Sequence, residues 1–98
     1  MEVKITKLNN LQMWPTGLIT LTAVHFKLDK EDYFLHYSCA DYEDVLTLYK
    51  GRHKCHLTRI TGCRGDLKDM IKFVRKPRCL KYVDTDHFIE KLKEYHLL

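Results

Sequence analysis

The sequence has few of the features that mark exported, membrane-spanning or disordered chains. Its first eight residues alternate polar and apolar side chains, so they lack the continuous apolar run of a secretory signal peptide. No apolar stretch approaches the roughly 20 residues that cross a bilayer. Two prolines and four glycines in 98 residues are too few for a disordered chain. We therefore expect one folded cytoplasmic domain over residues 1–98, with no membrane partner.

Catalytic and cofactor motifs are also missing. No serine or cysteine stands in a nucleophile motif. Residues 62–65 form a glycine-containing turn, but they lack the spacing and the Lys-Ser/Thr pair of a phosphate-binding loop. Asp84 and Asp86 offer two carboxylates for a divalent ion, although their place before an apolar helical stripe favours helix capping. We expect a protein that is not an enzyme and holds no cofactor.

The four cysteines do not follow a disulfide or zinc pattern. They stand at Cys39, Cys55, Cys63 and Cys79. Because the chain has no export signal, we expect free thiols. Zinc-ligating side chains gather at His53, Cys55, His56 and Cys63, but their spacing matches no zinc finger. We expect no metal site.

What the sequence does contain is a strongly basic middle. Residues 50–81 hold eleven lysines and arginines against two aspartates. Residues 1–49 hold four basic and seven acidic side chains, and residues 82–98 hold two and four. Such a segment makes a positive surface that attracts polyanions. The candidate binding residues are Arg52, Lys54, Arg59, Arg64, Lys68, Lys72, Arg75, Lys76, Arg78 and Lys81.

The first forty residues read as strands. Period-2 alternation predicts strands over residues 3–8, 17–28 and 33–39, with a polar turn at 29–32. A four-residue turn pairs Leu28 with Tyr33, and the pairs that follow along the two strands form one apolar face. The same register sets His25 opposite His36 on the other face, beside Lys27 and Phe34.

Helical spacing is prominent after residue 40. We predict helices over residues 41–50 and 66–76 and a last one capped by Asp84 or Thr85, with strands at 52–61 and 78–83. In the middle helix the apolar stripe is Leu67, Met70, Ile71 and Val74. In the last helix it is Phe88, Ile89, Leu92 and Tyr95. The predicted fold class is α+β: a mainly antiparallel sheet of three to five strands with about three helices packed on it.

A helix over residues 66–76 would align part of the basic segment. Arg64, Lys68, Lys72 and Arg75 follow one another at helical offsets and would form a ridge. A row of cations is suited to tracking phosphates, because each neutralised phosphate releases counterions. The alternative is a solvated helix face without a partner.

Some aromatic residues could extend such a surface. Most aromatic residues fall on the predicted core stripes, and the ones that could reach a surface and stack on bases are Tyr37, Tyr49, Phe73 and Tyr82. Trp14 is expected to pack back on the core, and the alternative is an exposed anchor for a partner.

These observations favour a small non-enzymatic binding or regulatory protein. We expect its basic surface to bind nucleic acid, DNA or RNA, mainly through phosphates. The alternative is an inhibitor or modulator that docks on an acidic host protein, one that mimics or handles nucleic acid. A small nuclease is a distant third interpretation.

Overall fold

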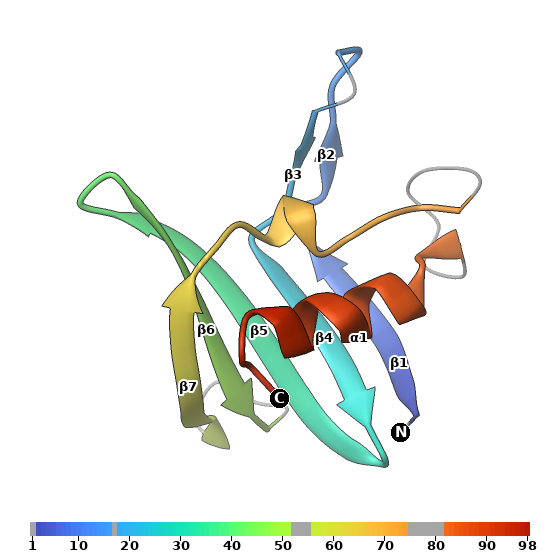
Figure 1. Ribbon diagram of the computed structural model, residues 1–98, viewed down its shortest axis with the longest axis vertical. Coiled ribbons are helices and arrows are strands. Elements are labelled where there is room, and N and C mark those ends of the chain that lie inside the picture. Colours follow the sequence, from blue (N-terminus) through green and yellow to red (C-terminus); the bar gives the residue numbers. More distant parts are fainter. Residues whose placement is uncertain (1, 17, 52–55, 75–81) are drawn as a thin grey trace.

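Antiparallel strands dominate the computed structural model, which describes residues 2–16, 18–51, 56–74 and 82–98 (Figure 1). Five strands form one sheet in the spatial order β1-β4-β5-β6-β7. They are β1 (Val3–Asn9), β4 (Ala23–Leu28), β5 (Glu31–Ala40), β6 (Glu43–Lys50) and β7 (Thr58–Arg64). Two short strands, β2 (Gln12–Met13) and β3 (Ile19–Thr20), make a separate hairpin. The described helical segments are the 3-10 turn η2 (Leu67–Asp69) and the helix α1 (Thr85–Glu94).

The predicted α+β fold with about three helices is therefore wrong. In the described residues the protein is mainly an antiparallel sheet with one α-helix and one 3-10 turn. The predicted strand over residues 3–8 is confirmed, and the one over 17–28 is divided into β3 and β4. The last strand β7 starts later than predicted and continues to Arg64, into the loop that was expected at 62–65. The predicted strand at 78–83 lies mostly outside the described residues.

Two tight turns set the register of the central strands. Asp29 and Lys30 link β4 to β5 with φ of 48° and 77°, and Asp41 and Tyr42 link β5 to β6 with φ of 51° and 63°. Consecutive positive φ values are typical of the two-residue hairpin turns whose twist matches that of the strands. Aspartate tolerates this conformation better than most residues, which partly replaces the usual glycine.

The turn at Asp29 and Lys30 is two residues shorter than predicted. Leu28 therefore pairs with Glu31, not with Tyr33. Because side chains alternate with a period of two, a shift of two residues leaves each side chain on the same face of the sheet. The predicted faces are thus confirmed, whereas the predicted partners are wrong.

The predicted helix over residues 41–50 is the strand β6. Leu46 and Leu48 are buried, while Val45, Thr47 and Tyr49 between and beside them face the other side of the sheet. This period-2 burial is typical of a strand, and β6 pairs with β5 on one side and with β7 on the other. Its aliphatic, β-branched and aromatic residues are suited to such a central strand. Pairing on both sides outweighs the helical spacing of the apolar residues.

The predicted helix over residues 66–76 is replaced by η2 and an extended segment. Asp66 caps η2, accepting a hydrogen bond from the Lys68 backbone N–H. After the turn the chain extends, and Phe73 pairs with Val83 in an isolated bridge. Val74, expected in the core, is 61% exposed. Residues 75–81 lie outside the described part of the chain.

The last helix is confirmed as α1. The Asp84 carboxylate accepts a hydrogen bond from the His87 backbone N–H, which satisfies a free donor of the first turn. Phe88 and Leu92, four residues apart, are fully buried. Within the described ranges, one amphipathic α-helix therefore covers the sheet.

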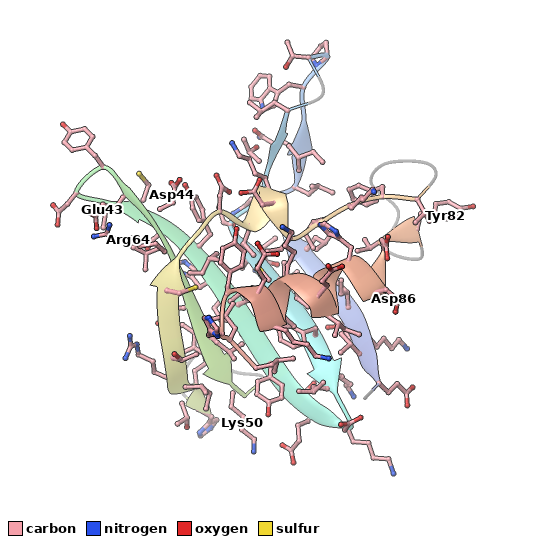
Figure 2. All side chains as sticks on the ribbon, viewed as in Figure 1. Glu43, Asp44, Lys50, Arg64, Tyr82 and Asp86 are labelled. Carbon is pink, nitrogen blue, oxygen red and sulfur yellow. The ribbon has the colours of Figure 1, made fainter. Side chains whose placement is uncertain are left out.

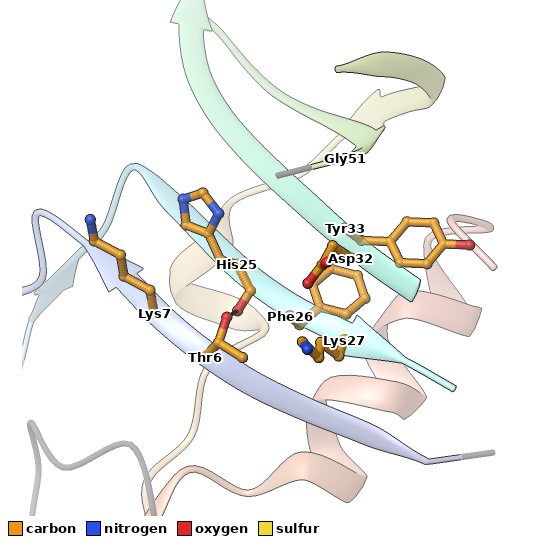
Figure 3. Close-up of a pocket in the computed structure, with 8 residues that line it drawn as sticks. All are labelled: Thr6, Lys7, His25, Phe26, Lys27, Asp32, Tyr33 and Gly51. Carbon is orange, nitrogen blue, oxygen red and sulfur yellow. Dashed lines mark hydrogen bonds between the residues drawn. The ribbon is translucent and has the colours of Figure 1, made fainter. Parts of the chain in front are cut away.

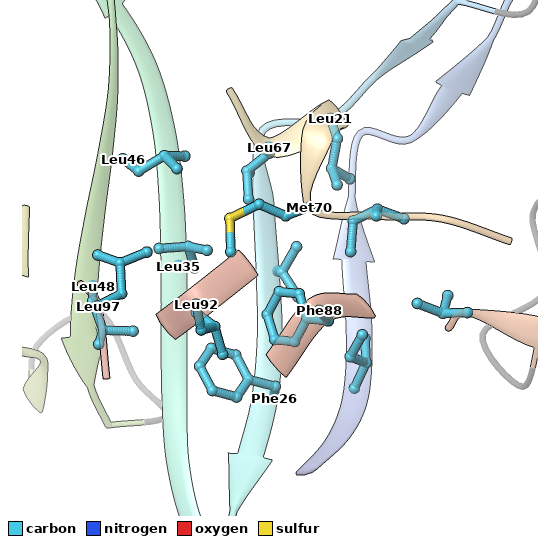
Figure 4. Packing of buried hydrophobic residues seen from close by; sticks show 14 residues of the cluster. Leu21, Phe26, Leu35, Leu46, Leu48, Leu67, Met70, Phe88, Leu92 and Leu97 are labelled. Atoms are coloured by element: carbon cyan, nitrogen blue, oxygen red, sulfur yellow. The ribbon is translucent and has the colours of Figure 1, made fainter. Parts of the chain in front are cut away.

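The hydrophobic core lies between this helix and one face of the sheet (Figures 1 and 4). The Phe26 and Phe88 rings meet edge to face with centroids 5.1 Å apart. Leu67, Met70 and Ile71, three of the four residues of the predicted stripe, close the same core from η2 and the residues that follow it. Fully burying each such side chain contributes about 1.5–3 kcal/mol, so this covered face provides most of the stability.

The hairpin of β2 and β3 extends away from the sheet (Figure 1). Trp14 lies at the end of β2 and is 50% exposed, so the expectation that it packs back on the core is wrong. Its backbone N–H donates to the Leu18 carbonyl, which holds the hairpin loop.

Candidate functional site

The second face of the sheet has no helix over it in the described part of the chain. The two described helical segments pack on the covered face, as the shared core with Leu46 and Leu48 shows. Phe34 and Tyr49 point the opposite way and remain half-buried. We call this second surface the open face. An antiparallel sheet can expose one face to water, but that face is then mostly polar. Aromatic side chains in its centre are therefore informative.

One row of paired residues crosses the open face from edge to edge. Lys7 pairs with His25, His25 with Phe34, Phe34 with Tyr49, and Tyr49 with Arg59. These five residues, one from each strand of the sheet, make up the cross-strand row. With neighbouring strands about 4.8 Å apart, the row spans about 19 Å. It places three rings between two exposed cations.

The rings of the cross-strand row are in contact. The Phe34 centroid lies 4.7 Å from that of His25 and 5.9 Å from that of Tyr49. His36, in the next row, adds a fourth ring 5.9 Å from Phe34. The interplanar angles of 35–44° leave the rings tilted against one another rather than stacked face to face. Phe34 is thus the centre of an aromatic surface that is partly open to solvent.

Two β-bulges bring the terminal cations onto this face. In β1 the pairing passes from Ile5 to Lys7, so Thr6 is an extra residue. In β7 it passes from Thr61 to Arg59, so Ile60 is extra. Without these bulges, Lys7 and Arg59 would point toward the covered face, because they stand two residues from side chains that do. Bulges that redirect a side chain in this way are common beside functional sites.

Gly62 leaves room for Arg59 to lie against the sheet. A Cβ atom at position 62 would stand 3.1 Å from an Arg59 guanidinium nitrogen. The Thr47 hydroxyl oxygen would lie 3.9 Å from the same Cβ position. The Arg59 guanidinium therefore lies over the open face instead of extending straight into solvent.

A shallow cavity of about 200 Å³ opens beside the β1 end of the row (Figure 3). We call it the hollow. It is lined by Thr6, Lys7, His25, Phe26, Lys27, Asp32, Tyr33 and Gly51. Burial, and then the positive charge of Lys7, lower the pKa of His25 below its ordinary value. The Asn9 side-chain nitrogen lies 3.3 Å from His25 Nε2 and fixes the ring.

The described basic residues of the predicted site do not form one ridge. Of the ten, the structure describes Arg59, Arg64, Lys68 and Lys72, and the other six lie outside the described residues: Arg52, Lys54, Arg75, Lys76, Arg78 and Lys81. Because residues 66–74 are not an α-helix, the predicted alignment of Arg64, Lys68 and Lys72 is wrong. Arg64 belongs to the open face through its pairing with Val45. Lys68 and Lys72 belong to the segment that packs on the covered face.

Two of these four cations have acidic partners. Arg64 Nη2 lies 2.9 Å from Glu43 Oε1 at the edge of the sheet (Figure 2). Lys68 Nζ lies 3.7 Å from an Asp66 carboxylate oxygen. The Arg64–Glu43 pair is largely exposed and the Lys68–Asp66 pair partly so, and such surface pairs contribute little to stability. They do reduce the local positive charge that a polyanion would meet.

The other residues singled out in the sequence have separate places. Tyr49 belongs to the cross-strand row, whereas Phe73 and Tyr37 pack against the core. Tyr37 also donates a hydrogen bond to Asp44, which raises the pKa of the tyrosine. Cys39 is an exposed free thiol. Cys63 is a half-buried free thiol whose pKa is raised by burial.

The zinc hypothesis cannot be built from described residues. His53 and Cys55 lie outside them, and in the described part of the chain no three His, Cys, Asp or Glu side chains form a metal-binding group. Asp84 serves as the helix cap that was expected of it.

Sequence reasoning missed the central residue of the open face. The alternation predicts Phe34 on the same face as His25 and Lys27, which the structure confirms, but it does not predict a binding role for the ring. The signal was present, because β5 has aromatic side chains on both faces. A strand with one ring facing solvent is unusual in a sheet that buries only one face.

No known protein family, curated protein or solved structure matches this chain. Among the described residues, no helix has both the length and the apolar character needed to cross a bilayer. A functional proposal therefore depends on the geometry of the site.

Proposed function

We propose that this protein binds single-stranded nucleic acid on the open face of its sheet. The cross-strand row is the observation that carries the proposal. Bases stack on exposed aromatic side chains, and each stacked base contributes about 1–3 kcal/mol to binding. Lys7 and Arg59, at the two ends of the row, supply the charges that a phosphate backbone needs.

Unpaired bases fit this surface better than a duplex does. The rings of Phe34 and Tyr49 lie on a broad sheet, which offers no protruding helix for a major groove. A paired base has its faces covered by its neighbours in the stack, so it cannot reach these rings. A single strand can lay its bases on them and leave its phosphates to the flanking cations.

The partner proposed here is still nucleic acid, as the sequence suggested, but the proposed binding surface is the open face instead of the ridge of the basic segment. Arg59 and Arg64 belong both to the basic segment and to the open face. Lys68 and Lys72 are exposed near the covered face, where they add to the long-range attraction of a polyanion. The proposed role is binding rather than catalysis, without a cofactor.

The first test measures binding of fluorescein-labelled dT15 and rU15 by fluorescence anisotropy, with a hairpin duplex of equal charge as competitor. Phe34→Leu keeps an apolar side chain but removes the ring. It should weaken binding about 10- to 100-fold, as the loss of one stacked base implies. Tyr42→Leu is the matched control, because Tyr42 is fully exposed at the β5–β6 turn and away from the row.

Three results would contradict the proposal. The first is wild-type protein that binds neither oligonucleotide at low salt. The second is equal affinity of Phe34→Leu and Tyr42→Leu. The third is a duplex that competes as well as a single strand. Circular dichroism and thermal melting of both variants confirm that any loss of binding is not a loss of fold.

A further inference from the structure

The hollow gathers positive charge that the fold does not need. Lys7 and Lys27 both line it, and Lys4 stands directly opposite Lys27 in the β1–β4 register. Like charges directly opposite each other destabilise a pair of strands. Asp32 is the one acidic residue in the lining, and it pairs with Lys27 across β4 and β5.

The hollow is also joined to the cross-strand row. Lys7 and His25 belong to both, so a group in the hollow lies next to a base stacked on Phe34. Figure 3 shows Lys7 and His25 standing side by side on the open face, with Lys27 further along β4. The opening is shallow, which suits a small anion that remains attached to a longer chain.

We propose that the hollow is a phosphate subsite, in which Lys7 and Lys27 together hold one backbone phosphate of the strand whose bases stack on Phe34 and Tyr49. This inference rests on the proposed function. It fixes the course of the strand: one phosphate lies at the β1–β4 end, and the following bases cross β5 and β6 toward Arg59. Because both lysines, which come from neighbouring strands, contact the same phosphate, their contributions to the binding free energy are not independent.

His25 reports on occupancy of the hollow. The charged residues that line the hollow with it are Lys7 on β1, Lys27 on its own strand β4 and Asp32 on β5, and His36 lies on the same face beyond Phe34. In the free protein burial and, after it, the positive charge of Lys7 lower the pKa of His25. A phosphate between the lysines offsets the charge of Lys7 and acts to raise this pKa, whereas further burial under the strand acts to lower it. An NMR titration of the His25 ring protons with and without dT15, in the wild type and in Lys7→Gln/Lys27→Gln, separates the two contributions, because only the phosphate contribution depends on the lysines.

The main experiment compares the salt dependence of dT15 binding for two double variants with the same change in charge. Lys7→Gln/Lys27→Gln removes both lysines of the hollow. Lys30→Gln/Lys93→Gln removes one exposed lysine from the β4–β5 turn and one from α1. If the two hollow lysines share one phosphate, the slope of log K against log salt should fall by about 0.7, the value per phosphate of a single strand. The control should keep the wild-type slope.

The single variants separate a shared phosphate from two separate contacts. For a shared phosphate, Lys7→Gln and Lys27→Gln are coupled, and the double variant loses less or more than the sum of the two. Additive losses, with a slope change of about 1.4, would mean two independent phosphates and would overturn the inference. An unchanged slope would overturn it as well.

These outcomes are distinct from a failure of the proposed function. If Phe34→Leu loses binding while Lys7→Gln/Lys27→Gln behaves like its control, the open face binds the strand but the hollow holds no phosphate. If wild-type protein does not bind dT15, both proposals are wrong.

Discussion

The two faces of the same sheet carry very different side chains. On the covered face, Leu35, Leu46 and Leu48 are buried under α1 and η2. On the open face, Phe34 and Tyr49 alternate with them along the same strands and remain half-exposed. A ring on a solvent-facing side gains less from burial than one in a core, so stability alone does not favour aromatic residues there. The comparison separates residues that hold the fold from residues that are available to bind.

The largest expected effect concerns the covered face. Met70→Asp places a charge where the side chain is fully buried, and we expect a loss of more than about 4 kcal/mol, enough to unfold the domain. Lys72→Asp, two residues away and exposed, should change stability by about 0.5 kcal/mol or less. Urea unfolding followed by circular dichroism measures both. Equal destabilisation would mean that η2 does not belong to the core.

Adjacent residues of β6 give a sharper comparison. Leu48→Ala removes a buried side chain and should cost about 2–5 kcal/mol of stability. Tyr49→Ala, on the open face, should cost about 1 kcal/mol but should weaken dT15 binding at least tenfold. Urea unfolding curves measure the stability of each variant, and fluorescence anisotropy on the same samples measures its affinity for dT15. Unchanged binding by Tyr49→Ala would mean that the Tyr49 ring does not contact the strand.

Charge reversal compares the two sets of cations. Arg59→Glu should weaken dT15 binding about tenfold, because it replaces a phosphate contact by a repulsion. Lys68→Glu/Lys72→Glu changes twice as much charge, but near the covered face, so we expect a loss of about threefold or less at physiological salt, where charges are screened beyond about 8 Å. The reverse order of losses would place the binding surface at Lys68 and Lys72 instead of the open face.

The smallest expected effect is a pH dependence of stability. The folded pKa of His25 is lowered, so the unfolded chain binds the proton more readily. The protein should therefore lose stability as the pH falls below the ordinary histidine pKa of about 6.5 and approaches the folded value. His25→Asn removes this contribution, and urea unfolding at pH 7.5 and pH 5.5 should show a smaller loss for the variant. An equal or greater loss would mean that His25 is not the group responsible.

The alternation of β4 and β5 could be predicted from the sequence, and so could α1. Side chains keep their face under any even shift of register, so the wrong turn length did not affect Phe26 or Phe34. The Asp84 cap and the stripe of Phe88 and Leu92 are local signals that need no tertiary information. These parts of the prediction held because they depend on near neighbours in the chain.

The two missing helices show where local signals fail. Leu48 fits a helical stripe and an alternating strand equally well, and only its pairing with Leu35 and Thr61 decides between them. Leu67 and Met70 are both buried, as a helix requires, but one 3-10 turn buries them as well. The spacing of apolar residues predicted which side chains enter the core. It did not predict the backbone conformation that brings them there.

The cross-strand row was beyond local prediction for a different reason. Its alignment depends on four strand pairings and on bulges at Thr6 and Ile60. Lys7 and Arg59 stand 52 positions apart in a chain of 98, and no spacing in the sequence relates them. A basic segment is visible as composition, whereas a row assembled from five strands is visible only once the sheet is formed.

The measurement that tests the central claim most directly is an NMR titration of ¹⁵N- and ¹³C-labelled protein with dT8. If the open face binds the strand, the ring signals of His25, Phe34 and Tyr49 shift first and most, and the amides of α1 stay in place. If the largest shifts fall on Lys68, Lys72 and α1, or if the rings of the open face do not shift at saturating dT8, the open face is not the binding surface.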